Sequence, residues 1–176
     1  MAHNEQRQFI WKVKNAFPRY FDEASVVEIG SLDINGSVRD FFTNTTEYIG
    51  VDLEEGPGVD LVCEGQEVDL PDDHFTTAIS AECFEHNPHW EATFLNMVRM
   101  ATHLVIFTCA TVGRREHGTT RTTPADSPFT VSKGWDYYRN LTADDFAHLD
   151  LDSMFTEYEF STNEVTHDLY FWGLKR

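Results

Sequence analysis

The sequence predicts an α/β fold in which a mostly parallel, twisted sheet carries helices on both faces. The first observation is that short apolar runs of strand character alternate with segments of helical periodicity. The second is that two apolar runs near the C-terminus are joined by a polar turn, which predicts a hairpin that adds one antiparallel strand. Residues 1–176 contain no repeat and no convincing boundary, so we expect one domain.

The N-terminal segment, residues 1–22, is expected to form a helix. Apolar side chains from Phe9 to Phe17 recur on one face at helical spacing, and Pro18 ends the pattern. Residues 25–29 form an apolar run that ends at Gly30, which is typical of a strand.

The next segments continue the alternation. Residues 36–42 are expected to form a helix with three apolar side chains turned inward. Strands are expected at residues 47–53, 59–63, 75–81 and 103–109. Between the last two, Asn87-Pro88 favours the start of a helix, with Asn as its cap and Pro in its first turn.

Residues 110–140 mix Gly, Pro, Thr and charged residues, so we interpret them as an irregular substrate-binding or lid segment. Thr142 and Asp145 resemble a capping box that opens a short helix through Leu149. The hairpin strands are expected at residues 155–160 and 168–174.

Composition excludes several classes of protein. Thirty acidic residues against 13 basic ones give a net charge of −17, which disfavours a nucleic-acid partner because phosphate neutralisation dominates such binding. No run of about 18 apolar residues occurs, so no membrane span is expected. The N-terminus lacks the apolar core of a secretory signal, and Cys63, Cys83 and Cys109 form no CxxC pair, so we expect reduced thiols in the cytoplasm.

The turn after the first apolar run indicates a ligand site. In an open α/β sheet, ligands bind at the carboxyl ends of the strands, and Gly30 lets a ligand approach the backbone. The helix expected after this turn would offer unpaired N–H groups. Asp52 ends the next strand about twenty residues later, where a carboxylate accepts hydrogen bonds from ribose hydroxyls.

Three successive stretches carry a family resemblance. VVEIGSLDINGSVRDFF, YIGVDLEEGPGVDLVCEGQEVDLPDDHF and TAISAECFEHNPHW resemble the ordered motifs of a class I S-adenosylmethionine-dependent methyltransferase. The chain is most similar to the small members of the methyltransferase-type-11-like group. The resemblance implies a Rossmann-like fold, S-adenosyl-L-methionine as cofactor, and methyl transfer to a small-molecule or metabolite acceptor.

The resemblance also implies cofactor-binding residues near the ends of the first four strands: Glu28, Gly30, Ser31, Gly36, Asp52, Leu53, Glu64, Gly65, Ala81 and Glu82. Among these, Asp52 would hold the ribose and Leu53 would pack on the adenine. Glu64 and Gly65 would reach the adenine, whereas the glycine turn and Glu82 would lie beside the methionine part.

The sequence departs from the family in two respects. Five residues separate Gly30 from Gly36, although the family places its glycines closer together. The links at residues 53–58 and 69–75 are too short for crossover helices, which normally need about a dozen residues. We therefore expect reduced crossovers around the second and third strands.

The acceptor is expected above the cofactor methyl, beneath the 110–140 segment. His117 is the candidate general base, although a loop histidine is more often only solvated. Arg114 and Arg115 are candidates for binding a carboxylate or phosphate, and surface arginines that balance local acids are the alternative. His86 and Trp135 complete the candidate substrate residues. Trp135 could stack on an aromatic acceptor or on adenine, and packing beneath the loop is the more frequent role of such a residue.

No metal is expected, because the spacing of Glu85, His86 and His89 does not match a strong zinc pattern. A non-catalytic cofactor-binding subunit shares every motif and remains an alternative. A protein or nucleic-acid methyltransferase would need a basic or extended groove, and a nicotinamide-dependent oxidoreductase would need the GxGxxG pattern that is absent here. An oligomer is compatible with all of these readings.

Overall fold

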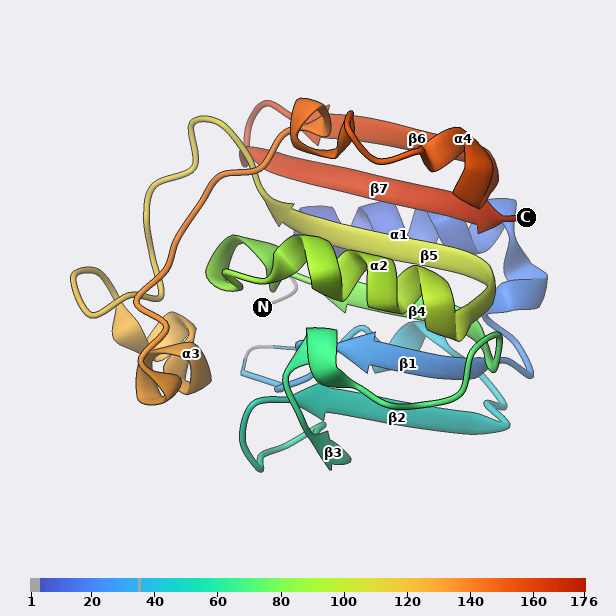
Figure 1. Ribbon diagram of the computed structural model, residues 1–176, viewed down its shortest axis with the longest axis horizontal. Coiled ribbons are helices and arrows are strands. Elements are labelled where there is room, and N and C mark those ends of the chain that lie inside the picture. The colour runs from blue at the N-terminus through green and yellow to red at the C-terminus, as the bar shows by residue number, and fades with distance from the viewer. Residues whose placement is uncertain (1–3, 35) are drawn as a thin grey trace.

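The computed structural model describes residues 4–34 and 36–176, and its centre is one seven-stranded sheet (Figure 1). The strands run in the order β3-β2-β1-β4-β5-β7-β6. Among them only β7 is antiparallel to the rest, since it pairs antiparallel with both β5 and β6. The strands are β1 (Ser25–Ile29), β2 (Glu47–Asp52), β3 (Leu61–Val62), β4 (Phe75–Ala81), β5 (Ala101–Ala110), β6 (Phe155–Asn163) and β7 (Asp168–Lys175).

Two longer helices cover the two faces of the sheet, α1 behind it and α2 in front of it in Figure 1. The α-helices are α1 (Asn4–Ala16), α2 (Trp90–Met100), α3 (Pro128–Lys133) and α4 (Leu151–Met154). Short 3₁₀ turns are η1 (Pro18–Tyr20), η2 (Arg39–Phe41), η3 (Gly65–Glu67), η4 (Phe84–His86), η5 (Pro124–Asp126) and η6 (Ala143–Phe146). No helix of the described ranges is long and apolar enough to cross a bilayer.

Each face of the sheet has its own apolar core. On one face α1 buries Phe9, Ile10 and Val13, and the Phe9 ring stacks on Tyr170 with centroids 4.6 Å apart. On the other face α2 buries an apolar stripe centred on Phe94 against β4 and β5. The predicted α/β class, the helices on both faces and the C-terminal hairpin are confirmed.

The helix predicted at residues 36–42 is wrong. Only the 3₁₀ turn η2 forms there, with Val38 and Phe42 buried beside it. The segment is too short to offset the cost of nucleating an α-helix, and the Ser37 hydroxyl accepts the Arg39 N–H at 3.0 Å in competition with helical bonding. The unpaired N–H groups expected from a helix after Gly30 are therefore not provided by this segment.

The α2 helix begins two residues later than Asn87-Pro88 predicts. Its N-cap is His89, and the Asn87 side chain accepts the His89 N–H at 2.8 Å in the preceding turn. The short connections from β2 to β4 carry only the 3₁₀ turn η3, which confirms the reduced crossovers. The Thr142 N–H donates to the Asp145 carboxylate at 2.8 Å as predicted, but the turn it opens is 3₁₀.

Candidate active site

The strand order reverses between β1 and β4, and this switch point is where ligands bind in open α/β sheets. Gly30 follows β1 there with φ +79°, a conformation that favours glycine. A Cβ on Gly30 would lie 2.7 Å from Cβ of Cys83, the residue that lies across the switch point after β4. The turn therefore requires glycine for both its conformation and its close approach.

Asp52 ends β2 beside this turn. Its Oδ2 accepts the Leu32 N–H at 2.9 Å, and its Oδ1 accepts the Leu53 N–H at 2.8 Å. Burial raises the pKa of Asp52, and the two N–H groups oppose that shift. The carboxylate thus fixes the loop after β1, while each oxygen keeps a second lone pair for a ligand hydroxyl.

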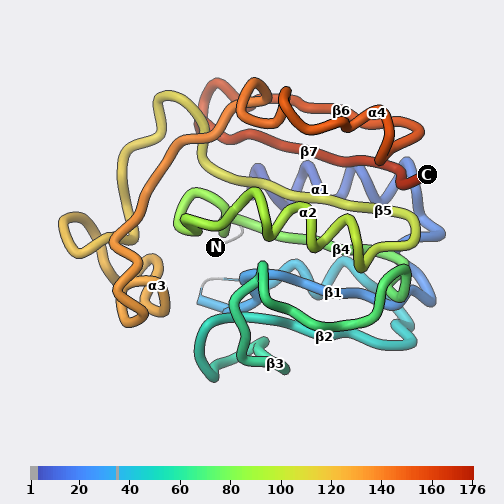
Figure 2. Tube along the Cα trace, in the orientation of Figure 1, coloured from blue at the N-terminus to red at the C-terminus, as the bar shows by residue number. Residues whose placement is uncertain are grey.

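Two small cavities lie on either side of Gly30 and Asp52, and both residues line both of them. Their volumes are about 60 and 40 Å³, whereas pockets for small-molecule ligands usually hold roughly 300–1,000 Å³. The α3 segment narrows both cavities, because Phe129 and Thr130 line the larger one and Thr130 lines the smaller one. Figures 1 and 2 show α3 beyond the carboxyl ends of the strands.

An ion pair joins the α3 segment to the sheet. Lys133 Nζ lies 2.7 Å from the Glu64 carboxylate, and this bond lowers the pKa of Glu64. The structure therefore places Glu64 against α3. Trp135 lines the smaller cavity with Leu53 and Gly65, so it lies on the predicted adenine side rather than beside His86.

Five predicted cofactor residues line neither cavity: Glu28, Ser31, Gly36, Glu64 and Ala81. Glu28 accepts a hydrogen bond from the Tyr48 hydroxyl at 2.6 Å, on the α1 side of the sheet. Ser31 packs against the loop after β2, and Ala81 lies in the core beneath α1. Their contribution to the site is the shape of the strand ends.

A larger pocket of about 640 Å³ adjoins the cleft formed by the two small cavities and has Glu82, His86, His117, Arg114 and Arg115 among its walls. Glu82 and His86 also line the larger of the two cleft cavities, so the two spaces share a wall. Glu82 is a buried residue at φ +54°, the kind of strained backbone that clusters at functional sites.

The two arginines of this pocket differ. Arg114 Nη1 donates to the Asp168 carboxylate at 3.0 Å and to the Thr166 carbonyl at 2.8 Å, so it anchors the pocket wall to the hairpin. Arg115 is exposed and makes no ion pair with any described residue. Arg115 is therefore the better placed of the two for an anionic group.

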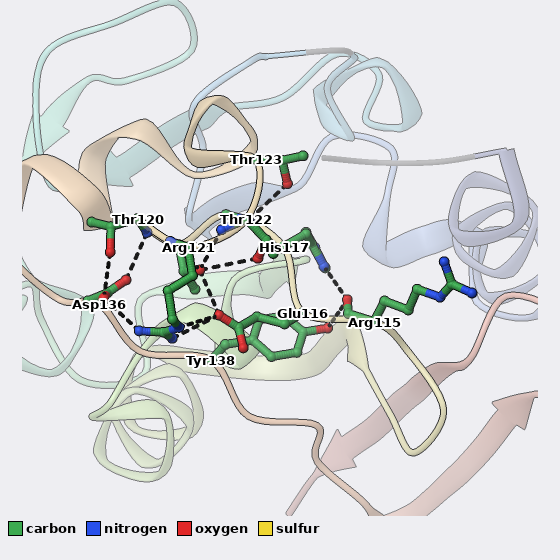
Figure 3. Close-up of polar contacts among 11 residues, drawn as sticks. Arg115, Glu116, His117, Thr120, Arg121, Thr122, Thr123, Asp136 and Tyr138 are labelled. Atoms are coloured by element: carbon green, nitrogen blue, oxygen red, sulfur yellow. Dashed lines mark hydrogen bonds and ion pairs between the residues drawn. The ribbon is translucent and has the colours of Figure 1, made fainter.

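His117 is held by the loop around it, as Figure 3 shows. Its Nδ1 lies 3.1 Å from the Arg115 carbonyl oxygen, which also accepts the Tyr138 hydroxyl at 3.1 Å. Since a carbonyl only accepts, Nδ1 is the donor in this bond, which leaves Nε2 outside it. The Tyr138 ring contacts the rings of both His117 and His86.

Burial dominates the titration of the remaining groups. It lowers the pKa of His86 to about 3, which keeps that imidazole neutral, and it raises the pKa of Glu82 and of Glu85. Burial also raises the pKa of Cys83 to about 12, so this thiol is not a nucleophile near neutral pH.

Residues 110–140 are expected to be a substrate-binding or lid segment, and α3, within that range, contributes Phe129 and Thr130 to the larger cavity. Cys83 follows the carboxyl end of a strand, which in the sequence is compatible with pocket lining or with burial, and it lines both cavities. Leu32 carries no sequence signal of its place in the wall.

Comparisons with solved structures identify the fold. The chain is similar to the YcgJ protein from Bacillus subtilis, with TM-score 0.63, 11% identity and 99% of each chain covered. It is similar to magnesium protoporphyrin IX methyltransferase from Synechocystis PCC 6803 with bound S-adenosylmethionine, with TM-score 0.60, 11% identity, and 97% of this chain and 79% of that chain covered.

A third similar structure is phosphoethanolamine N-methyltransferase 2 from Haemonchus contortus in complex with S-adenosylhomocysteine. The TM-score is 0.60 at 14% identity, over 94% of this chain and 52% of that one. No model of a known protein family matches the chain, and no curated protein is significantly similar to it. The fold is that of the S-adenosylmethionine-dependent, class I methyltransferases.

Proposed function

We propose that this protein transfers a methyl group from S-adenosyl-L-methionine to a small-molecule acceptor in the cytoplasm. The observation that carries the proposal is the meeting of the Gly30 turn and the Asp52 carboxylate in one cleft at the switch point of the sheet. Asp52 would accept hydrogen bonds from the ribose hydroxyls, and the turn would make room for the methionine part.

The acceptor would bind in the adjoining 640 Å³ pocket. Glu82 and His86 line both this pocket and the larger cleft cavity, so an acceptor in the pocket would lie next to the cofactor methyl. The sulfonium already carries an activated methyl group, so the protein has mainly to align the acceptor and exclude water. His117 would take the acceptor's proton where the acceptor holds one.

Cofactor entry would require the α3 segment to move. The two cleft cavities are too small for S-adenosylmethionine while Phe129, Thr130 and Trp135 lie over them. The segment is held to the sheet by the exposed Lys133–Glu64 pair, and such pairs are weak. A lid that opens for the cofactor and closes over it would also exclude water.

Isothermal titration calorimetry with S-adenosylmethionine, S-adenosylhomocysteine and NAD tests the proposal. We expect both sulfur ligands to bind and NAD to give no heat. Asp52→Ala should abolish binding, because a ribose partner and the anchor of the Leu32 amide are both lost. Asp69→Ala is the matched control, since Asp69 is an exposed carboxylate outside the cleft.

Melting temperatures of both variants separate loss of binding from loss of fold. Binding of NAD alone, or equal binding by Asp52→Ala, contradicts the proposal. Tight cofactor binding without turnover, across a panel of acceptors with labelled methyl donor, favours the non-catalytic subunit instead.

A further inference from the structure

Three side chains converge beside the 640 Å³ pocket in a way that the methyl-transfer chemistry does not require: His86 and His117 line it, and Glu85 is buried behind them. Glu85 and His86 lie on η4 after β4, and His117 lies on the loop after β5. Each offers one potential ligand atom, and these atoms lie within 4.8 Å of one another. Donors at about 2.0–2.2 Å from one ion lie at most about 4.4 Å apart, so a small side-chain rotation would close this set around a cation.

The first two side chains are buried without partners. Glu85 is fully buried, and His86 is 4% exposed. Three of their atoms have no hydrogen-bond partner among the residues that the structure describes: both carboxylate oxygens of Glu85 and Nδ1 of His86. The amides of Glu85 and Ala110 stabilise this carboxylate electrostatically without making a hydrogen bond of normal geometry. Buried polar atoms are normally satisfied, so these require an explanation.

The surroundings hold the three side chains in place. Gly118 packs on the His86 ring, where a Cβ would lie 2.7 Å from Cε1. Tyr138 contacts both imidazoles, and the His117 Nδ1–H donates to the Arg115 carbonyl. A hydrogen bond from one ring nitrogen to a carbonyl is the usual support of a metal-binding histidine, because it fixes the tautomer and orients the ring.

We propose that Glu85, His86 and His117 bind one divalent transition-metal ion whose open coordination positions face the 640 Å³ pocket. Two imidazoles and one carboxylate suit Zn²⁺ or Mn²⁺, whereas Mg²⁺ prefers oxygen ligands alone. Three protein ligands leave room for a water molecule or a substrate atom. Glu82 is buried and lines the same pocket; its Oε2 makes no hydrogen bond among the described residues and lies 3.9 Å from Arg114 Nη2, so it can bind the outer side of such a ligand.

The metal also points to the class of acceptor, an inference that rests on the proposed function. With His117 bound to the ion it would not act as the general base; a hydroxyl oxygen bound to the ion would instead lose its proton to solvent, more readily than a free hydroxyl does. That oxygen would then attack the methyl carbon, and the carbon–sulfur bond would break with its electron pair remaining on sulfur. The products are a methyl ether and S-adenosylhomocysteine. We therefore expect a hydroxylated acceptor.

Calorimetric titration of the metal-stripped protein with ZnCl₂, and separately with MnCl₂, tests the site without any cofactor. We expect one ion per chain. Glu85→Gln, which preserves shape, and His117→Ala should each weaken binding by more than the roughly 10- to 100-fold that loss of an outer-shell partner costs. Titration with Mn²⁺ avoids the free cysteines, because thiolates favour Zn²⁺.

His89→Ala is the matched control, because His89 lies three residues beyond His86 but outside the cluster. It should bind metal like the parent, and melting temperatures should show that every variant folds. Absence of a site for both ions, or equal affinity in Glu85→Gln, would overturn the proposal and leave Glu85 as a buried protonated acid. S-adenosylmethionine binding measured in excess EDTA tests the proposed function without any metal. Binding there together with absence of a metal site would overturn the metal proposal alone.

Discussion

Gly30→Ala tests the geometry of the turn on which the cofactor cleft depends. The new side chain would sit at φ +79° with its Cβ 2.7 Å from Cys83 Cβ and 2.9 Å from its Sγ. The left-handed backbone costs about 1–2 kcal/mol for a residue other than glycine. Overpacking of a tight contact adds about 1–3 kcal/mol. We therefore expect a loss of about 2–5 kcal/mol, a large part of the roughly 5–15 kcal/mol that stabilises a typical domain.

Gly134→Ala is the matched control for this substitution. Gly134 has φ +81°, but a Cβ there meets no atom within 4 Å, so only the backbone cost of about 1–2 kcal/mol applies. Urea unfolding followed by far-UV circular dichroism measures both variants. Gly134 is the C-cap of α3, so local opening of α3 would reduce the stability lost in Gly134→Ala. The difference in unfolding free energy between the two variants would then be larger. Equal losses in the two variants would refute the close approach of Cys83 to Gly30.

Two further predictions concern the lid and the pH dependence of stability. Lys133→Gln removes the pair with Glu64 and should speed S-adenosylmethionine association by roughly fivefold at most, the size that one exposed ion pair allows. Stopped-flow fluorescence of Trp135 measures this rate, with Lys12→Gln as control, and an unchanged rate contradicts the latch. Burial raises the pKa of Glu28 from 4.5 to about 7, so the folded chain binds a proton that the unfolded chain has released. Stability should therefore fall by up to about 3 kcal/mol as the pH rises from about 4.5 to 7. Glu28→Gln should remove that loss in urea titrations at pH 5 and 8, and an unchanged pH dependence would contradict the assignment.

The sheet was predictable because buried strands leave continuous apolar runs that end at recognisable residues. Gly30 and Asp52 end two such runs, so their positions at one edge of the sheet followed from the parallel arrangement. The segment at residues 36–42 was not predictable in the same way. Its inward apolar side chains satisfy a helix and a 3₁₀ turn equally, and local hydrogen bonds with Ser37 decided between them.

The acceptor side of the site was only partly predictable. His117 is separated from Glu85 and His86 by α2 and β5, and the sequence carries no information about where the loop after β5 places it. The placement of α3 over the cleft depends on tertiary contacts such as Lys133 with Glu64. The spacing of Glu85, His86 and His89 along the chain gives no indication that His117 lies beside the first two.

The most direct measurement is a crystal structure of the protein with S-adenosylhomocysteine. The account requires both ribose hydroxyls within hydrogen-bond distance of Asp52, the thioether beside Gly30, and α3 displaced from the positions that line the two small cavities. A ligand bound elsewhere, or an Asp52 carboxylate that contacts only the Leu32 and Leu53 amides, would contradict it.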